Sequence, residues 1–159
     1  VIFASNVFED ILSDEASQLT GGLGFAPSGN IGTDAALFEP SSGSVPKYAH
    51  KYRVNPSAMI LTCKMMLEYL GLDDDAKKIE KALGEVLVES KHGTLPYDVL
   101  RDFRGDPDWE KNAASTIDMA AAIAQKLNPE FTGKRLEEAK AKVHKMCAWD
   151  EASLIGVDD

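Results

Sequence analysis

Residues 54–88 have the sequence VNPSAMILTCKMMLEYLGLDDDAKKIEKALGEVLV, which predicts two consecutive helices. Asn55 is a favourable N-cap, and Pro56 suits the first helical position because its missing N–H needs no partner there. Gly71 can adopt the left-handed conformation that ends the first helix near Leu70. Three aspartates then lie at the positive end of the second helix dipole. The apolar residues on one face of this second helix are Leu72, Ile79, Leu83 and Val86.

Shorter elements precede this helix pair. Two apolar runs, residues 1–4 (VIFA) and 35–38 (AALF), predict buried strands, and residues 10–20 predict a helix with one apolar face. Residues 21–32, GGLGFAPSGNIG, predict a loop, since so many glycines favour close backbone approaches and left-handed conformations. Strands with flanking helices indicate an α/β chain that is rich in helix.

Two further helices are expected towards the C-terminus. Ser115, with Asp118 three residues later, resembles a capping box and predicts a helix that ends near Leu127. Pro129 breaks that helix, and residues 132–149 predict the last one.

Composition excludes several classes of protein. The 159 residues include 17 Lys and Arg against 26 Asp and Glu, a net charge of −9, which disfavours partners such as nucleic acid or an anionic membrane. Apolar residues at 44% and charged residues at 27% are globular values. No apolar run reaches the ~18 residues of a membrane helix, and residues 1–4 lack the basic flank of a signal peptide. Cys63 and Cys147 fit no CxxC pattern, which favours a reducing cytoplasmic interior over a disulfide framework.

Asp10 and Asp14 form a candidate metal-binding pair. Their spacing of four residues places both carboxylates on one side of a helix, where they repel each other. A hard cation such as Mg²⁺ or Mn²⁺ would relieve that repulsion, because it prefers oxygen ligands. On spacing alone, a solvated helix face remains the simpler explanation.

Two segments could bind a phosphate. Residues 41–48, SSGSVPKY, combine hydroxyls, a glycine and a lysine on one loop, and Tyr48 and Tyr52 could stack on a purine. Tyr97 and Arg101 lie four residues apart, so that a hydroxyl and a guanidinium could clamp a phosphate together. A polar surface loop and a solvated side-chain pair are the alternatives.

Other catalytic signatures are missing from the sequence. His50, His92 and His144 are scattered, and none lies at ligand or triad spacing from a cysteine or a carboxylate. Each histidine is therefore expected at the surface or as a satisfied core residue.

Four ordered blocks carry a family resemblance. They are NVFEDILSD (6–14), GGLGFAPSGNIG (21–32), ALFEPSSGSVPKYA (36–49) and VNPSAMIL (54–61), the last followed by MMLEYLG (65–71). This order resembles the isocitrate/isopropylmalate dehydrogenases, which are metal-dependent β-decarboxylating enzymes. The resemblance implies the helix-rich C-terminal part of a three-layer α/β/α fold. Residues 1–127 would belong to the large dehydrogenase domain, and residues 128–159 would form a helical extension.

The resemblance assigns roles to individual positions. Asp10 and Asp14 match the aspartates that bind Mg²⁺ or Mn²⁺ with the substrate. The residues that match the adenine-ribose loop are Ser42, Gly43, Ser44, Val45, Pro46, Lys47 and Tyr48. Asn55 matches an adenine contact, with Val54 beside it.

The resemblance also implies the cofactor and the substrate. Lys47 and Tyr48, with Tyr97 and Arg101, match the residues that hold the 2′-phosphate in NADP-dependent isocitrate dehydrogenases. NAD-dependent members tend to carry an aspartate there, which repels that phosphate. The chain departs from the family pattern at Ser42, where a histidine is usual.

The resemblance therefore predicts part of an NADP-dependent isocitrate dehydrogenase, an enzyme of the tricarboxylic acid cycle that converts isocitrate to 2-oxoglutarate. The whole protein would be a homodimer in the cytoplasm or an organelle matrix. Glu9 departs from the family pattern, where a glycine is usual. No catalytic residue is expected in this chain, because the family's catalytic residues precede these blocks. Two alternatives stay open: a related dehydrogenase of isopropylmalate, homoisocitrate, malate or tartrate, and a non-catalytic nucleotide-binding or assembly fragment.

Overall fold

The structure is a computed structural model that describes residues 2–43, 45–49, 51–89, 94–103 and 105–147. Within these ranges the helices are α1 (Asn6–Ser17), α2 (Ser57–Tyr69), α3 (Asp73–Glu89), α4 (Trp109–Asn112), α5 (Thr116–Leu127) and α6 (Gly133–Cys147). The strands are β1 (Pro27–Ile31) and β2 (Ala36–Pro40). The described chain is therefore a helix-rich α/β structure, as predicted.

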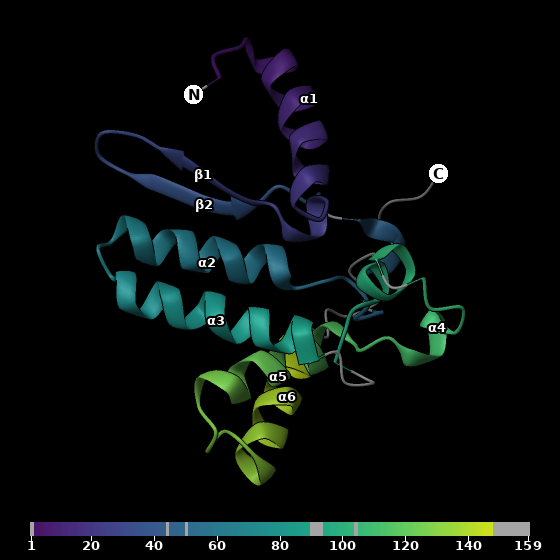
Figure 1. Ribbon diagram of the computed structural model, residues 1–159. Helices are drawn as coiled ribbons and strands as arrows, with labels where there is room; N and C mark the ends of the chain where they lie inside the picture. Colours follow the sequence, from purple (N-terminus) through teal and green to yellow (C-terminus); the bar gives the residue numbers. More distant parts are fainter. Residues whose placement is uncertain (1, 44, 50, 90–93, 104, 148–159) are drawn as a thin grey trace, which may run out of the picture.

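The predicted helix pair is confirmed as α2 and α3, which lie side by side at the centre of Figure 1. Before α2, the Asn55 side-chain carbonyl accepts a hydrogen bond of 3.0 Å from the Ser57 N–H. After α2, Gly71 takes the positive φ of +76° that a helix-ending glycine supplies. The Gly71 signal acts where the sequence places it. At the start of α2 the N-cap residue is Pro56, one position after the predicted Asn55.

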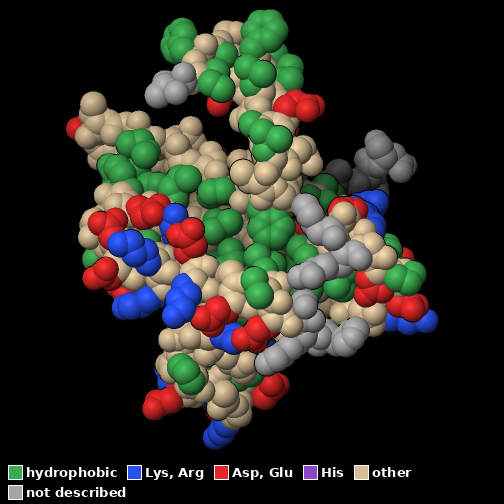
Figure 2. Space-filling view, in the orientation of Figure 1, with side chains coloured by type: hydrophobic (Ala, Val, Ile, Leu, Met, Phe, Trp, Pro, Cys, Tyr) green, Lys and Arg blue, Asp and Glu red, His purple; other side chains and the backbone are tan. Residues whose placement is uncertain are grey.

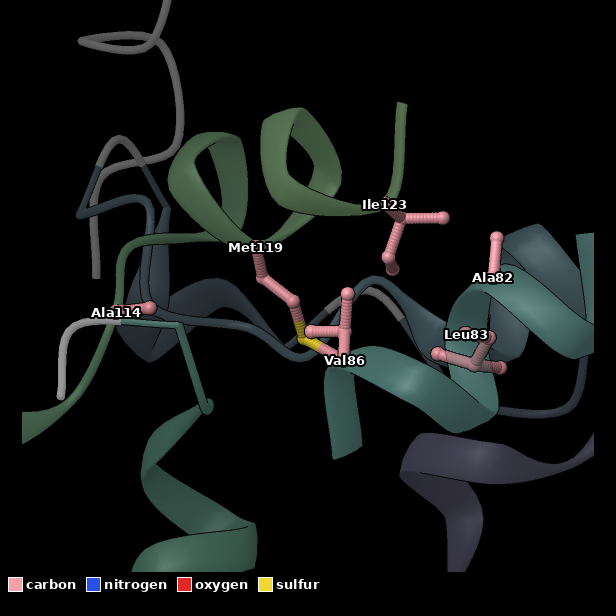
Figure 3. Close-up of a cluster of buried hydrophobic side chains, with 6 residues drawn as sticks. All are labelled: Ala82, Leu83, Val86, Ala114, Met119 and Ile123. Atoms are coloured by element: carbon pink, nitrogen blue, oxygen red, sulfur yellow. The ribbon is translucent and has the colours of Figure 1, made fainter. Parts of the chain in front are cut away.

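The hydrophobic core lies between α3 and α5. It contains Ala82, Leu83 and Val86 on α3, Met119 and Ile123 on α5, and Ala114 in the segment before α5 (Figure 3). Met119 is fully buried at its centre. The apolar stripe predicted for the second helix thus forms the core through Leu83 and Val86, whereas Leu72 at its start is exposed.

β1 and β2 form an antiparallel hairpin that packs on α2 (Figure 1). The prediction of a loop over residues 21–32 is therefore wrong for β1, where Gly29 pairs with Phe38. A side chain at Gly29 would meet the Phe38 ring at 3.1 Å, so this glycine permits close packing. The predicted strand at 35–38 exists as β2, but it is only half buried, since Leu37 is exposed.

The predicted strand at residues 1–4 is wrong for the residues described. Residues 2–4 have no regular structure, and the Phe3 side chain is fully exposed. A strand needs a neighbour for its N–H and C=O groups, and the hairpin is the only sheet in the described ranges.

α1 projects away from the other helices (Figure 1). It begins at Asn6, four residues before the predicted start, and continues into a 3₁₀ turn, Gln18–Thr20. Its apolar side chains Val7, Phe8, Ile11 and Leu12 are exposed. Figure 2 shows hydrophobic side chains gathered over this end of the molecule, at the top of the view.

The C-terminal helices follow the predicted signals. The Ser115 hydroxyl accepts a hydrogen bond of 3.1 Å from the Asp118 N–H at the start of α5, which confirms Ser115 as the N-cap of this helix. α5 ends before Pro129, and α6 follows from Gly133. Among the helices described, none is long and apolar enough to cross a membrane.

Candidate functional site

A cavity of about 400 Å³, here called the Asn55 cavity, lies where four distant segments meet. Its wall is formed by the glycine-rich segment, the loop after β2 and the residues before α2. The fourth segment is a single π-helical turn, Val99–Phe103, together with the two residues that precede this turn. The lining residues are Gln18, Gly21, Gly22, Leu23, Gly24, Ser42, Gly43, Val45, Val54, Asn55, Tyr97, Asp98 and Asp102. Six of them were predicted from the sequence as cofactor contacts: Ser42, Gly43, Val45, Val54, Asn55 and Tyr97.

Glycines bring one wall of the cavity close to the other. A Cβ on Gly24 would lie 2.7 Å from Oδ2 of Asp98 and 3.2 Å from Nδ2 of Asn55. Gly21 and Gly22 have φ angles of +113° and +85°, which L-amino acids rarely adopt. The glycines therefore allow the backbone of this segment to pack closely against the Asn55 and Asp98 side chains.

Asn55 and Asp98 meet on the cavity wall. Nδ2 of Asn55 donates a hydrogen bond of 2.9 Å to Oδ2 of Asp98, and Asn55 is only 6% exposed. The other oxygen of this carboxylate, Oδ1, is buried and has no hydrogen-bond partner within the described structure. A buried acceptor without a partner is costly, so this oxygen is suited to a donor from a ligand.

Sequence reasoning missed Asp98. Its only signal in the sequence is its place beside Tyr97, between the apolar residues Pro96 and Val99. A charged residue in such a segment needs a partner, but the sequence does not identify Asn55 as that partner.

A cation–aromatic cluster lies beside the cavity. It consists of Lys47, Tyr48, Tyr97, Arg101 and Trp109. The ring centroids of Tyr48 and Tyr97 are 5.7 Å apart, and Nζ of Lys47 lies 5.2 Å from the Tyr48 ring. Cζ of Arg101 lies 5.5 Å from the Tyr97 ring. The structure thus brings together the two pairs that the sequence predicts as a phosphate site.

Trp109 completes the cluster and was not predicted. Its ring lies 6.0 Å from that of Tyr97 and 5.8 Å from Cζ of Arg101. Burial raises the pKa of the Tyr97 hydroxyl, and the neighbouring Tyr48 and Asp98 raise it further. Tyr97 therefore stays protonated at neutral pH and can donate a hydrogen bond to an anion.

Arg101 already has an acidic partner. Its Nε and Nη2 donate hydrogen bonds of 2.6 and 2.8 Å to the two oxygens of Asp102. This pairing raises the pKa of the Arg101 guanidinium and lowers the pKa of the Asp102 carboxyl. Since Asp102 also lines the cavity, an incoming phosphate would compete with it for Arg101.

The remaining predicted loop residues lie at the edge of the site. Pro46, Lys47 and Tyr48 form a 3₁₀ turn just after the cavity-lining Val45, and do not line the cavity themselves. Ser44 lies outside the described residues. Tyr52, predicted to stack on a purine, lines a separate cavity of about 150 Å³ instead.

Asp10 and Asp14 are exposed on α1, as their helical spacing predicts. In the described part of the chain, no group of three or more His, Cys, Asp or Glu side chains could hold a metal ion. The pair therefore offers oxygen donors of the kind that Mg²⁺ prefers, but too few for a complete site. Glu9 beside the pair is exposed as well.

Comparison with known proteins gives one consistent family. The family model described as isocitrate/isopropylmalate dehydrogenase matches residues 1–123. A 3-isopropylmalate dehydrogenase of Methanothermobacter thermautotrophicus is 48% identical over 126 residues, 79% of this chain and 34% of the relative. An NADP isocitrate dehydrogenase of Archaeoglobus fulgidus is 42% identical over 127 residues, 80% of this chain and 29% of the relative.

The fold agrees with these matches. The crystal structure of isocitrate dehydrogenase from Methylococcus capsulatus superposes with a TM-score of 0.67 and 43% identity. The aligned region covers 77% of this chain and 33% of that structure. The chain thus spans about a third or less of the length of these relatives.

Proposed function

Because the chain belongs to the isocitrate/isopropylmalate dehydrogenase family, we propose that it forms the adenosine- and 2′-phosphate-binding part of an NADP-dependent isocitrate dehydrogenase. The whole enzyme would oxidise isocitrate and decarboxylate the product to 2-oxoglutarate. The observation that carries the proposal is the cation–aromatic cluster at the edge of the Asn55 cavity.

The chemistry of this cluster suits a 2′-phosphate. Lys47 and Arg101 supply positive charge next to the rings of Tyr48 and Tyr97, whose hydroxyls can donate hydrogen bonds to a phosphate. Charge-assisted hydrogen bonds to a phosphate are about twice as strong as neutral ones. A carboxylate at the position of Lys47 would instead repel the phosphate, so the lysine favours NADP over NAD.

The Asn55 cavity is suited to the adenine and ribose. The unpartnered Oδ1 of Asp98 can accept a hydrogen bond from an exocyclic amine, and Asn55 holds that carboxylate in place. The close approach of the Gly24 backbone to Asp98 and Asn55 keeps these two side chains on the cavity wall, where a larger residue at position 24 would displace them. The cavity residues thus orient the cofactor's adenosine half, while the nicotinamide of bound NADP⁺ supplies the hydride acceptor.

Asp10 and Asp14 would supply two of the oxygen ligands for Mg²⁺ or Mn²⁺. The metal, when bound, would act as a Lewis acid on the 2-hydroxy acid. Further ligands would come from the substrate and from parts of the enzyme outside this chain. The homodimer and the catalytic residues are likewise proposed for the whole enzyme.

A second candidate is a dehydrogenase of 3-isopropylmalate. The observation in its favour is the 48% identity to the Methanothermobacter relative of that description. It shares the metal pair and the cavity with the first proposal but gives no reason for the cation–aromatic cluster.

An activity assay on the protein, purified as the cell makes it, distinguishes the two candidate functions. Isocitrate and 3-isopropylmalate are each assayed with NADP⁺ and NAD⁺ in the presence of Mg²⁺ or Mn²⁺. The proposal predicts the highest kcat/KM for isocitrate with NADP⁺. Turnover of 3-isopropylmalate but not isocitrate would contradict the proposed substrate. A higher kcat/KM with NAD⁺ than with NADP⁺ would contradict the proposed cofactor.

A further inference from the structure

α6 contacts the segment that leads into the Asn55 cavity, although α6 lies beyond the family-matched residues 1–123. The ring of His144 on α6 packs edge to face against Tyr52, with centroids 4.7 Å apart and planes at 71°. Tyr52 lies three residues before Asn55. An element outside the matched region thus touches the entry to the site.

Tyr52 has a backbone conformation that needs support. Its φ of +49° lies in the left-handed region, which a bulky residue adopts only when its surroundings hold it there. The Tyr52 carbonyl accepts a hydrogen bond of 2.7 Å from the N–H of Thr116, the first residue of α5. The Thr116 hydroxyl also donates to the carbonyl of Val54. Residues 52–54 are therefore held at the start of α5 by two hydrogen bonds.

α6 also supports the start of α5 directly. Nζ of Lys140 donates a hydrogen bond of 2.8 Å to Oδ1 of Asp118, whose Oδ2 accepts a hydrogen bond from the Ser115 hydroxyl. Ser115 is the N-cap of α5 and precedes Thr116. One helix thus reaches the same backbone segment by two routes, through His144 and through Lys140.

The fastened segment forms part of the cavity wall. Val54 and Asn55 line the Asn55 cavity, and Asn55 positions Asp98. A shift of residues 52–54 would move these groups relative to the glycine-rich wall on the opposite side.

We propose that α6 is a positioning element for the Asn55 cavity, with His144 and Lys140 holding residues 52–55 in their ligand-binding arrangement. The effect on nucleotide affinity rests on the proposed function, whereas the effect on the backbone does not. α6 would thus influence cofactor binding without touching the cofactor.

The test uses the protein purified as the cell makes it and three variants. His144→Ala removes the ring contact, and His144→Phe restores an aromatic edge. Lys134→Ala is the matched control, because Lys134 lies on the same helix with its side chain 90% exposed. The first readout is hydrogen exchange of the Thr116 amide, compared with the Ala76 amide, which bonds to Leu72 at the start of α3. The second readout is the Kd for adenosine 2′,5′-bisphosphate.

For His144→Ala we expect faster exchange at Thr116 by about twofold to tenfold, the factor that corresponds to an edge-to-face aromatic contact. Exchange at Ala76 should not change, and the Kd should rise by a similar factor. His144→Phe should recover most of both effects, and Lys134→Ala should show neither.

Unchanged exchange at Thr116 in His144→Ala would overturn the proposal. Equally faster hydrogen exchange at Thr116 and Ala76 would also overturn it, because that result would mean that the substitution destabilises the whole fold. If the unmodified protein, purified as the cell makes it, binds no nucleotide, the proposed cofactor site is wrong, and the Thr116 exchange still decides whether α6 positions the segment.

Discussion

Asn55 and Asp98, 43 residues apart in the sequence, are joined by a hydrogen bond of 2.9 Å from Nδ2 to Oδ2. The same amide group accepts the Ser57 N–H at the start of α2. The cavity wall is therefore connected to the central helix pair through one side chain. The backbone of Gly24 packs directly against these two side chains, and this approach is possible because glycine has no Cβ.

Gly24→Ala should disrupt this arrangement. The new Cβ would lie 2.7 Å from the Asp98 carboxylate, and the resulting shift should cost about 1–3 kcal/mol of stability. Nucleotide affinity should fall as well. The control is Gly84→Ala in α3, where a Cβ meets nothing within 4 Å and should add about 0.5–1 kcal/mol of helix stability. Urea unfolding measures both; equal effects of the two variants would contradict the close approach at Gly24.

Lys47→Gln should weaken binding of nucleotides that carry a 2′-phosphate. The lysine lies beside the Tyr48 ring, and loss of one charge-assisted contact should raise the Kd of NADP⁺ about tenfold. NAD⁺ affinity should change little, because NAD⁺ has no phosphate there. Lys77→Gln on α3 matches the charge change away from the cluster and should affect neither ligand. Calorimetric titration of both ligands tests this, and equal losses for NADP⁺ and NAD⁺ would argue against a 2′-phosphate role.

Asp102→Asn should have the opposite effect. It removes the carboxylate that competes for Arg101 and lines the cavity, while it keeps the side-chain volume. Exposed ion pairs are weak, so NADP⁺ should bind only about twofold to fivefold more tightly. The gain should shrink at high salt, where exposed charges are screened. Weaker NADP⁺ binding in this variant would mean that Asp102 orients Arg101 for the ligand.

Asp118→Asn should lower stability in a pH-dependent way. Hydrogen bonds from Lys140 and Ser115 lower the pKa of the Asp118 carboxyl from 3.8, its ordinary value. A lowered pKa means that the ionised form stabilises the fold above pH 3.8, and that this contribution is lost as the pH falls towards the lower pKa of the folded state. The difference from the unmodified chain should therefore be constant near pH 7 and should diminish below pH 3.8. Urea midpoints across this range measure it; a difference that grows on acidification would contradict the assignment.

Met119→Ala should strongly destabilise the chain. Met119 is fully buried between α3 and α5, and its truncation should cost about 2–5 kcal/mol. Met59→Ala is the matched control, since the Met59 side chain in α2 is 51% exposed. Thermal unfolding of the two variants should differ clearly, and similar midpoints would show that the α3–α5 core does not limit stability.

Local signals predicted the helices because the physics that forms them is local. Gly71 and the Ser115–Asp118 pair act through neighbouring backbone groups, so their positions in the sequence were sufficient. The hairpin was harder, because β1 exists through its pairing with β2 rather than through its own composition. The strand expected at residues 1–4 failed for the same reason, since no described strand pairs with it.

For the candidate site too, local patterns were predictable from the sequence and long-range contacts were not. The spacing of Tyr97 and Arg101 was visible in the sequence, and the resemblance connected them with Lys47 and Tyr48. Asp98 and Trp109 were missed, because their importance comes from contacts with residues far along the chain. No pattern in the sequence indicates that His144 meets Tyr52.

The central claim is that the cation–aromatic cluster binds a 2′-phosphate. Calorimetric titration of the protein purified as the cell makes it, with adenosine 2′,5′-bisphosphate and with adenosine 5′-monophosphate, tests it most directly, because the two ligands differ only in that phosphate. We predict that the bisphosphate binds at least about tenfold more tightly, the factor expected for one added charge-assisted contact. Equal affinity for the two ligands, or tighter binding of the monophosphate, would contradict the account.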